Sequence, residues 1–115
     1  MKKIKEHYEA RRCEVYAKNR ESLKIMWDDK EEIRKHIYSE LINENSAIVE
    51  VGVRLAENAC LMYTYNPKEM FLVDPWISIA GYPHHSSNKK FYERVKNVFE
   101  GYNNVKIKKK GQKKQ

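Results

Sequence analysis

One stretch constrains the fold of this chain more than any other: the short apolar run at residues 48–51 and the glycine that ends it. The run is rich in β-branched residues and is interrupted only by Glu50. It follows the turn-forming residues 43–46 and stops at Gly52. An apolar run that is bounded in this way predicts a buried strand that enters a tight turn.

A helix and a second strand follow this turn. From Leu55 onward the apolar residues recur at helical spacing, until Pro67 ends the pattern. Residues 70–73 form another apolar run, which closes on Asp74. This order of strand, glycine turn, helix and strand predicts a parallel pair of strands, with a ligand crevice at their carboxyl ends.

These residues resemble a known family. The motif Glu50-x-Gly52 followed by Ala56, with Asp74 at the end of the next strand, is similar to the N-terminal half of class I S-adenosylmethionine-dependent methyltransferases. The resemblance extends over residues 46–110. It implies a Rossmann-like sheet in which the glycine turn runs against the methionine end of S-adenosylmethionine. It also implies that the acid after the second strand holds the ribose hydroxyls.

The resemblance further implies which residues bind the cofactor. Asp74 is the ribose clamp, and Trp76 is the neighbour of the adenine. Ala56 departs from the pattern, because the family has a glycine there and an alanine methyl group crowds the approach of a ligand. A simpler interpretation also stands, since an aspartate at the end of a strand often caps a turn. The full set has four residues in the turn and two after the second strand: Glu50, Gly52, Val53, Arg54, Asp74 and Trp76.

Two helices are predicted before the first strand. Residues 2–20 contain neither glycine nor proline and are rich in charged helix-forming residues. A second helix is predicted from Asp28, where Glu31 completes a capping box, to residue 43. The form of residues 23–27 stays open. The second helix is expected to pack against the sheet through an apolar stripe of three residues: Ile33, Ile37 and Leu41.

The chain beyond the second strand adds one more helix and one more strand. A long turn contains His84 and His85, which lack carboxylate or cysteine partners at ligand spacing, so no metal site is predicted. A helix is predicted over residues 88–100, with Gly101 as its stop, and a short third strand around residues 105–107.

The elements together predict an α/β fold: two N-terminal helices followed by the βαβαβ half of a Rossmann-like methyltransferase sheet. Right-handed crossovers place the strands in the spatial order 3-2-1, with strand 1 at an edge. The chain then divides into an N-terminal helical segment (residues 1–45), a partial cofactor-binding domain (residues 46–110) and a basic tail (residues 111–115).

The composition limits the partners of the chain. Residues 104–115 contain six lysines and no acid, so most of the net charge of +7 lies in the tail and a nucleic-acid partner is not expected. Cys13 and Cys60 lack metal or redox spacing, and Cys60 is expected to be a buried thiol. No secretory signal and no run of ~20 apolar residues is visible, so a cytoplasmic protein without a membrane partner is expected.

Two functions are open at this point. The first is a truncated or degenerate methyltransferase-like domain that binds S-adenosylmethionine weakly and is not catalytically complete alone. No strand is predicted to pair with the outer edge of strand 1, where the family has its fourth strand, and no catalytic residue can be assigned. The second is a non-enzymatic interaction protein that binds a protein or nucleic acid through an exposed strand edge or its lysine-rich tail. In both, the unpaired edge of strand 1 is expected to pair with a second copy or a complementing chain.

Overall fold

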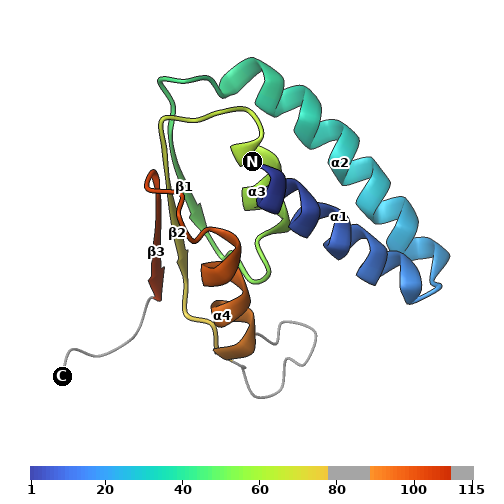
Figure 1. The fold of residues 1–115 in the computed structure, drawn as a ribbon. Helices are drawn as coiled ribbons and strands as arrows, with labels where there is room; N and C mark the ends of the chain where they lie inside the picture. Colours follow the sequence, from blue (N-terminus) through green and yellow to red (C-terminus); the bar gives the residue numbers. More distant parts are fainter. Residues whose placement is uncertain (78–88, 110–115) are drawn as a thin grey trace.

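The computed structural model describes residues 1–77 and 89–109 of the chain. Over these residues the protein is a mixed α/β structure with four helices and a three-stranded parallel sheet (Figure 1). The predicted class and the predicted order of elements are therefore confirmed. His84, His85 and the tail at residues 111–115 lie outside the described residues. The elements are α1 (Lys2–Ala17), α2 (Glu21–Leu41), β1 (Ala47–Val51), α3 (Glu57–Tyr63), β2 (Glu69–Asp74), α4 (Lys89–Val98) and β3 (Val105–Lys109).

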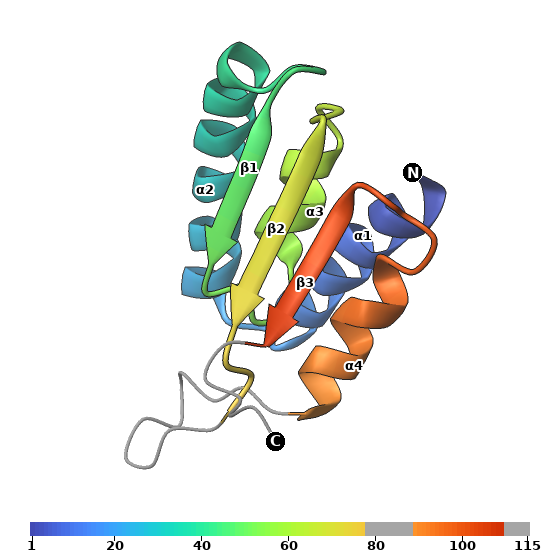
Figure 2. The same cartoon turned by 90° about the vertical axis from the view of Figure 1, so that its left-hand side faces the viewer.

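The sheet has β2 at its centre, with β1 and β3 paired in parallel on either side. This order confirms the prediction that strand 1 lies at an edge. All four helices lie behind the sheet in Figure 2, so they cover one of its two faces. On the other face the described residues leave the apolar side chains Val49 and Val51 exposed. The described residues thus cover one face of the sheet and leave the other face uncovered.

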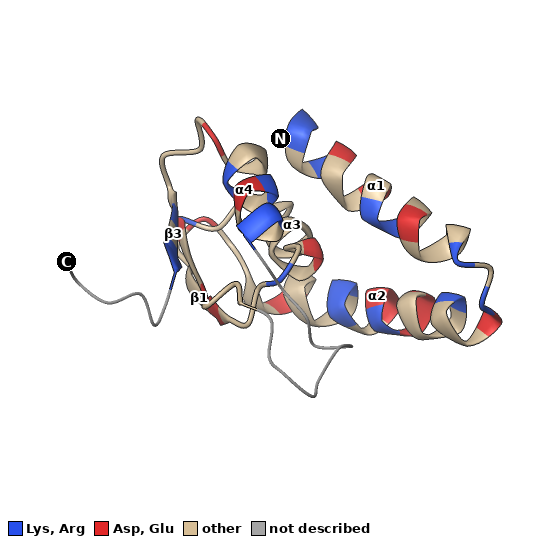
Figure 3. Cartoon of the chain, turned by 90° about the horizontal axis from the view of Figure 1, so that it is seen from below, with Lys and Arg blue, Asp and Glu red and all other residues tan. Residues whose placement is uncertain are grey.

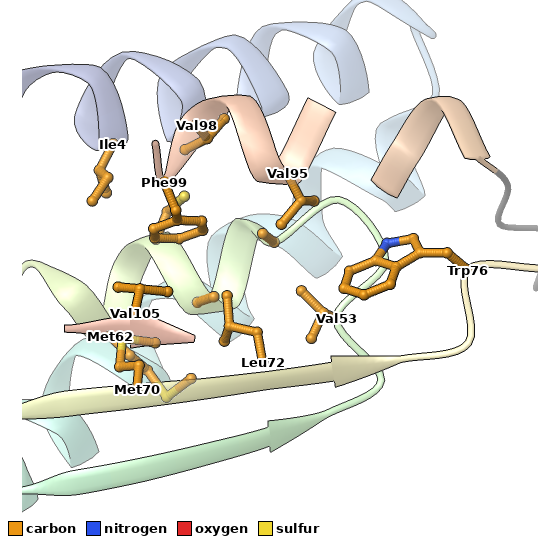
Figure 4. Close-up of a cluster of buried hydrophobic side chains, with 13 residues drawn as sticks. Ile4, Val53, Met62, Met70, Leu72, Trp76, Val95, Val98, Phe99 and Val105 are labelled. Atoms are coloured by element: carbon orange, nitrogen blue, oxygen red, sulfur yellow. The ribbon is translucent and has the colours of Figure 1, made fainter. Parts of the chain in front are cut away.

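The core lies between the sheet and the helices. Alternate residues of β2 point to opposite faces, and Met70 and Leu72 on the helix side are fully buried. Val95 and Phe99, from α4 and the residue that follows it, pack against them, and Ile4 brings α1 into the same cluster (Figure 4). Cys60 is buried in this core as expected, and burial raises the pKa of its thiol to about 12.

Two buried polar side chains attach α1 to the start of α3. Nε2 of His7 lies 2.8 Å from the carbonyl oxygen of Leu55. That oxygen can only accept, so Nε2 carries the proton, and burial lowers the pKa of His7 and keeps the ring neutral. Arg11 pairs with Glu57 at 3.2 Å and with Glu14 at 2.7 Å. Sequence reasoning missed this attachment, because a charged residue on a helix usually faces solvent.

Helix α2 begins at Glu21, so the predicted start at Asp28 is wrong. Residues 21–27 contain no glycine or proline, and the helix continues through them without a cap in its interior. Both members of the predicted capping box instead bind α1 from the middle of the helix. Asp28 accepts a hydrogen bond from the hydroxyl of Tyr16, and Glu31 pairs with Arg12.

The predicted packing of the α2 stripe against the sheet is also wrong. Ile33, Ile37 and Leu41 are 60%, 41% and 69% exposed. The inner side of the helix carries Tyr38 instead, whose hydroxyl donates to Oδ1 of Asn58 in α3 at 2.7 Å. Helical spacing identified an apolar stripe, but the contacts with α1 and α3 turned it away from the core.

Candidate functional site

The turn between β1 and α3 has an unusual backbone. Gly52, Arg54 and Ala56 all have positive φ angles, of 86°, 53° and 64°. A left-handed conformation suits glycine and disfavours residues with a Cβ atom, at about 1–2 kcal/mol each. Helix α3 begins only at Glu57, so the turn is longer than the sequence predicted. Ala56, where the family pattern has a glycine, adopts the backbone conformation that favours one.

Asp74 holds this turn in place from the end of β2. Its Oδ2 accepts hydrogen bonds from the backbone N–H groups of Val53 at 2.7 Å and Arg54 at 2.8 Å. Its Oδ1 accepts one from the N–H of Trp76 at 2.7 Å. The side chain is buried, with the residue only 6% exposed. Asp74 therefore fixes the two loops that follow β1 and β2 to each other.

These contacts bear on the predicted ribose clamp. A carboxylate offers about four acceptor positions, and the backbone of this protein occupies three of them at Asp74. A ribose hydroxyl at this site would use the remaining one. The role of Asp74 toward a ribose stays a prediction, while its role in holding the turn follows from the geometry.

Trp76 completes the connection between the two loops. Its indole N–H donates to the carbonyl oxygen of Arg54 at 2.8 Å, and its ring lies 4.9 Å from the ring of Tyr92 in α4. The side chain lies beside Val53 in the core (Figure 4). Its own φ of 46° is left-handed, a strained conformation for an aromatic residue. The predicted contact between Trp76 and an adenine stays a prediction.

Glu50 is the titratable group of the predicted set that the fold perturbs most. Its Oε2 accepts a hydrogen bond from Nδ2 of Asn58 at 2.7 Å, while Oε1 is buried without a hydrogen-bond partner among the described residues. Burial raises the pKa of this carboxyl group to about 7. A carboxyl group with such a pKa exchanges its proton near neutral pH, which is a property of many functional sites.

The described residues leave the space in front of Gly52 open. A methyl group built on Gly52 would meet none of their atoms within 4 Å. The fold brings the six predicted residues together at the carboxyl ends of β1 and β2, as predicted for parallel strands: Glu50, Gly52, Val53, Arg54, Asp74 and Trp76. A ligand could approach the backbone of the turn at Gly52 without displacing a side chain of residues 1–77 or 89–109.

A cavity beside the turn was not predicted from the sequence. It has a volume of about 620 Å³ and lies between α1, α2 and the turn. Of the six residues predicted to bind a cofactor, only Arg54 lines it. Its other basic residues are scattered between positions 11 and 34, and only the folded helix pair brings them together.

Comparison of the chain with protein-family models, with curated proteins and with solved structures gives no match. Within residues 1–77 and 89–109, no group of three His, Cys, Asp or Glu side chains is placed to hold a metal ion. None of the described helices has the length and apolar character needed to cross a membrane. The function is therefore inferred from the geometry of the site alone.

Proposed function

We propose that this chain is a methyltransferase-like module that binds S-adenosylmethionine at the carboxyl ends of β1 and β2 and is not catalytically complete alone. The observation that carries the proposal is the turn at residues 52–56, with its three alternating left-handed residues, held by the acid that ends the next parallel strand. Gly52 has no side chain of its own, and the described residues place none within 4 Å of it, which suits close approach of a cofactor.

The charge of the site supports the same ligand. S-adenosylmethionine carries a positive sulfonium group and a positive ammonium group. Glu50 lies near the end of β1, just before the turn, and a cation near Glu50 would stabilise its ionised form and lower its pKa from about 7.

The arrangement of helices supports the proposal that the module is incomplete. A doubly wound Rossmann-like sheet has helices on both faces, whereas the described residues cover one face (Figure 2). Methyl transfer depends on holding donor and acceptor in position, which requires a closed site. In this proposal a second copy or another chain supplies the missing wall.

The test compares two glycine variants that strain the backbone equally. Gly52 and Gly101 have φ angles of 86° and 87°, and a Cβ atom on either meets no atom of the described residues within 4 Å. Gly52→Ala and Gly101→Ala should each lower the free energy of unfolding by about 1–2 kcal/mol. Only Gly52→Ala places a methyl group in the path of the cofactor, so it should weaken S-adenosylmethionine binding at least about tenfold in calorimetric titration.

Gly101, in the turn before β3, is the control for backbone strain. Equal loss of binding in both variants would show that the effect is one of stability. A wild-type chain that fails to bind S-adenosylmethionine at millimolar concentration would contradict the cofactor proposal altogether.

A second candidate function, self-association, is favoured by the exposed stripe of α2. Ile33, Ile37 and Leu41 form an apolar row on a helix that lies behind β1 near its outer edge (Figure 2). That edge has no partner strand among the described residues. Contiguous exposed apolar residues beside an unpaired strand are typical of an interface.

The sequence of α2 makes a second copy the best-matched partner. An antiparallel pairing about a two-fold axis at Ile37 places Ile33 opposite Leu41 of the other copy. It also places the basic Arg34 opposite the acidic Glu40 of the other copy. Such self-complementarity is what a two-fold interface requires.

The expected result of Ile37→Lys is a shift of this assembly to monomer. Two lysines would then meet on the axis, while the monomer loses little because Ile37 is already 41% exposed. Ile25→Lys is the matched control, since Ile25 is an exposed isoleucine of the same helix outside the stripe. Sedimentation across a wide concentration range checks both variants. A wild-type chain that remains monomeric at high concentration excludes this second function.

A further inference from the structure

The cavity between α1, α2 and the turn is strongly basic. Six cations and two carboxylates are among the residues that line it. Lys and Arg, drawn blue in Figure 3, occur on both helices of the pair. The cations come from both helices, the link between them and the turn: Arg11, Lys18, Arg20, Lys30, Arg34 and Arg54.

The two carboxylates of the cavity pair with Arg11, which belongs to the lining, and with Arg12, which lies outside it. Glu31 accepts from the hydroxyl of Tyr8 at 2.7 Å and pairs with Arg12, and Glu57 pairs with Arg11 at 3.2 Å. Four cations of the lining make no ion pair within the residues that the structure describes: Lys18, Arg20, Lys30 and Arg34. Unpaired cations that converge on one hollow attract an anion.

The rest of the lining is apolar and aromatic. Leu23, Met26 and Trp27 of α2 contribute to it, and the ring of Trp27 packs against Tyr8 at 5.5 Å. The Nε1 atom of Trp27 is buried and has no hydrogen-bond acceptor among the described residues. Buried donors are normally satisfied, and the described residues provide no acceptor for this N–H group.

We propose that this cavity binds a small phosphorylated molecule with a planar or apolar body, of about the size of a nucleoside monophosphate. A phosphate supplies both negative charge and acceptor oxygens for the lysines and arginines of the lining. The apolar body then lies on Met26 and Trp27. A volume of about 620 Å³ is in the range of pockets that hold molecules of this size.

This site is separate from the proposed cofactor site. Gly52, Asp74 and Trp76 do not line the cavity. A hollow with an excess of cations also disfavours the positively charged sulfonium of S-adenosylmethionine. The two proposals therefore stand or fall independently, although Arg54 touches both sites.

The experiment titrates the full chain with adenosine 5′-monophosphate, adenosine and inorganic phosphate, by calorimetry and by tryptophan fluorescence. The monophosphate should bind at least about tenfold more tightly than either of its parts, because the phosphate and the body use different walls of the cavity. Its affinity should fall as the salt concentration rises. Equal affinity for inorganic phosphate and the monophosphate would overturn the proposal, since it would indicate a non-specific anion.

Two variants and a charge-matched control complete the test. Lys18→Gln/Lys30→Gln should weaken monophosphate binding at least about tenfold, whereas Lys5→Gln/Lys68→Gln, which removes two exposed lysines outside the lining, should not. Trp27→Phe should abolish the fluorescence response, because Trp76 is buried in the core. Gly52→Ala should leave monophosphate binding intact. Equal weakening by both lysine pairs, or preferential binding of a single-stranded oligonucleotide, would contradict a small-molecule site.

Discussion

Asp74→Ala is expected to remove about 4.5–9 kcal/mol from the free energy of unfolding, because hydrogen bonds to a charged acceptor contribute about 1.5–3 kcal/mol each and three are lost together. The substitution leaves the backbone N–H groups of Val53, Arg54 and Trp76 without their hydrogen-bond acceptor. Domains of this size have a total stability of about 5–15 kcal/mol, so the variant would lie close to unfolding. Urea denaturation followed by circular dichroism measures the change.

Asp74→Asn is the graded control for this result. An asparagine of the same shape can keep its oxygen toward Val53 and Arg54, but its amide group cannot accept from the N–H of Trp76. It should therefore lose less than half as much stability as the alanine variant. A loss below about 1.5 kcal/mol for alanine would show that Asp74 does not hold the turn. The same dependence makes Asp74→Ala unsuitable for testing cofactor binding.

Glu50→Gln is expected to stabilise the chain at pH 8 by about 3 kcal/mol and to have little effect at pH 4.5. Burial raises the pKa of Glu50 to about 7 in the folded state, from an ordinary value of 4.5. Below pH 4.5 both states hold the proton. Between pH 4.5 and 7 the unfolded chain releases its proton first, so stability falls as pH rises. Glutamine removes this loss and still accepts from Asn58.

Thermal unfolding of the wild type and the Glu50→Gln variant from pH 4.5 to 8 checks the direction of this change in stability. The two melting temperatures should be close at acid pH and separate as pH rises, with the variant higher. Glu44→Gln serves as control, because that side chain is exposed in the loop before β1. A variant that is less stable than wild type at pH 8 would mean that the charged form of Glu50 is stabilised in the folded state.

The central unit of the fold was predictable because its signals are local. The β-branched run, Gly52 and the apolar pattern from Leu55 each act over a few residues, and together they define a strand, a turn and a helix. The parallel sheet and its order followed from the handedness of crossovers. What these signals could not provide was the length of the turn, since Asp74, at the far end of β2, holds its residues Val53 and Arg54.

The surroundings of that unit were less predictable, and α2 shows why. An apolar stripe at helical spacing indicates that a helix packs against something, but it does not identify the element or chain that it packs against. Ile33 and Ile37 satisfied the pattern for packing on the sheet, yet Tyr38 and Glu31 face the rest of the chain. Likewise, an acid at the end of a strand can bind a ligand or the backbone of its own protein. The sequence does not distinguish these roles, whereas the short distances from Asp74 to the N–H groups of Val53 and Arg54 show the contact with the backbone.

The attachment of α1 has a consequence for the order in which the chain folds. This helix comes first in the sequence, but its partners come late: His7 meets Leu55 across 48 positions, and Glu14 pairs with Arg94 across 80. Contacts between distant positions form slowly, because a long loop must close before they contribute. On the ribosome α1 would emerge well before its site exists, so its final docking must wait for α3 and α4.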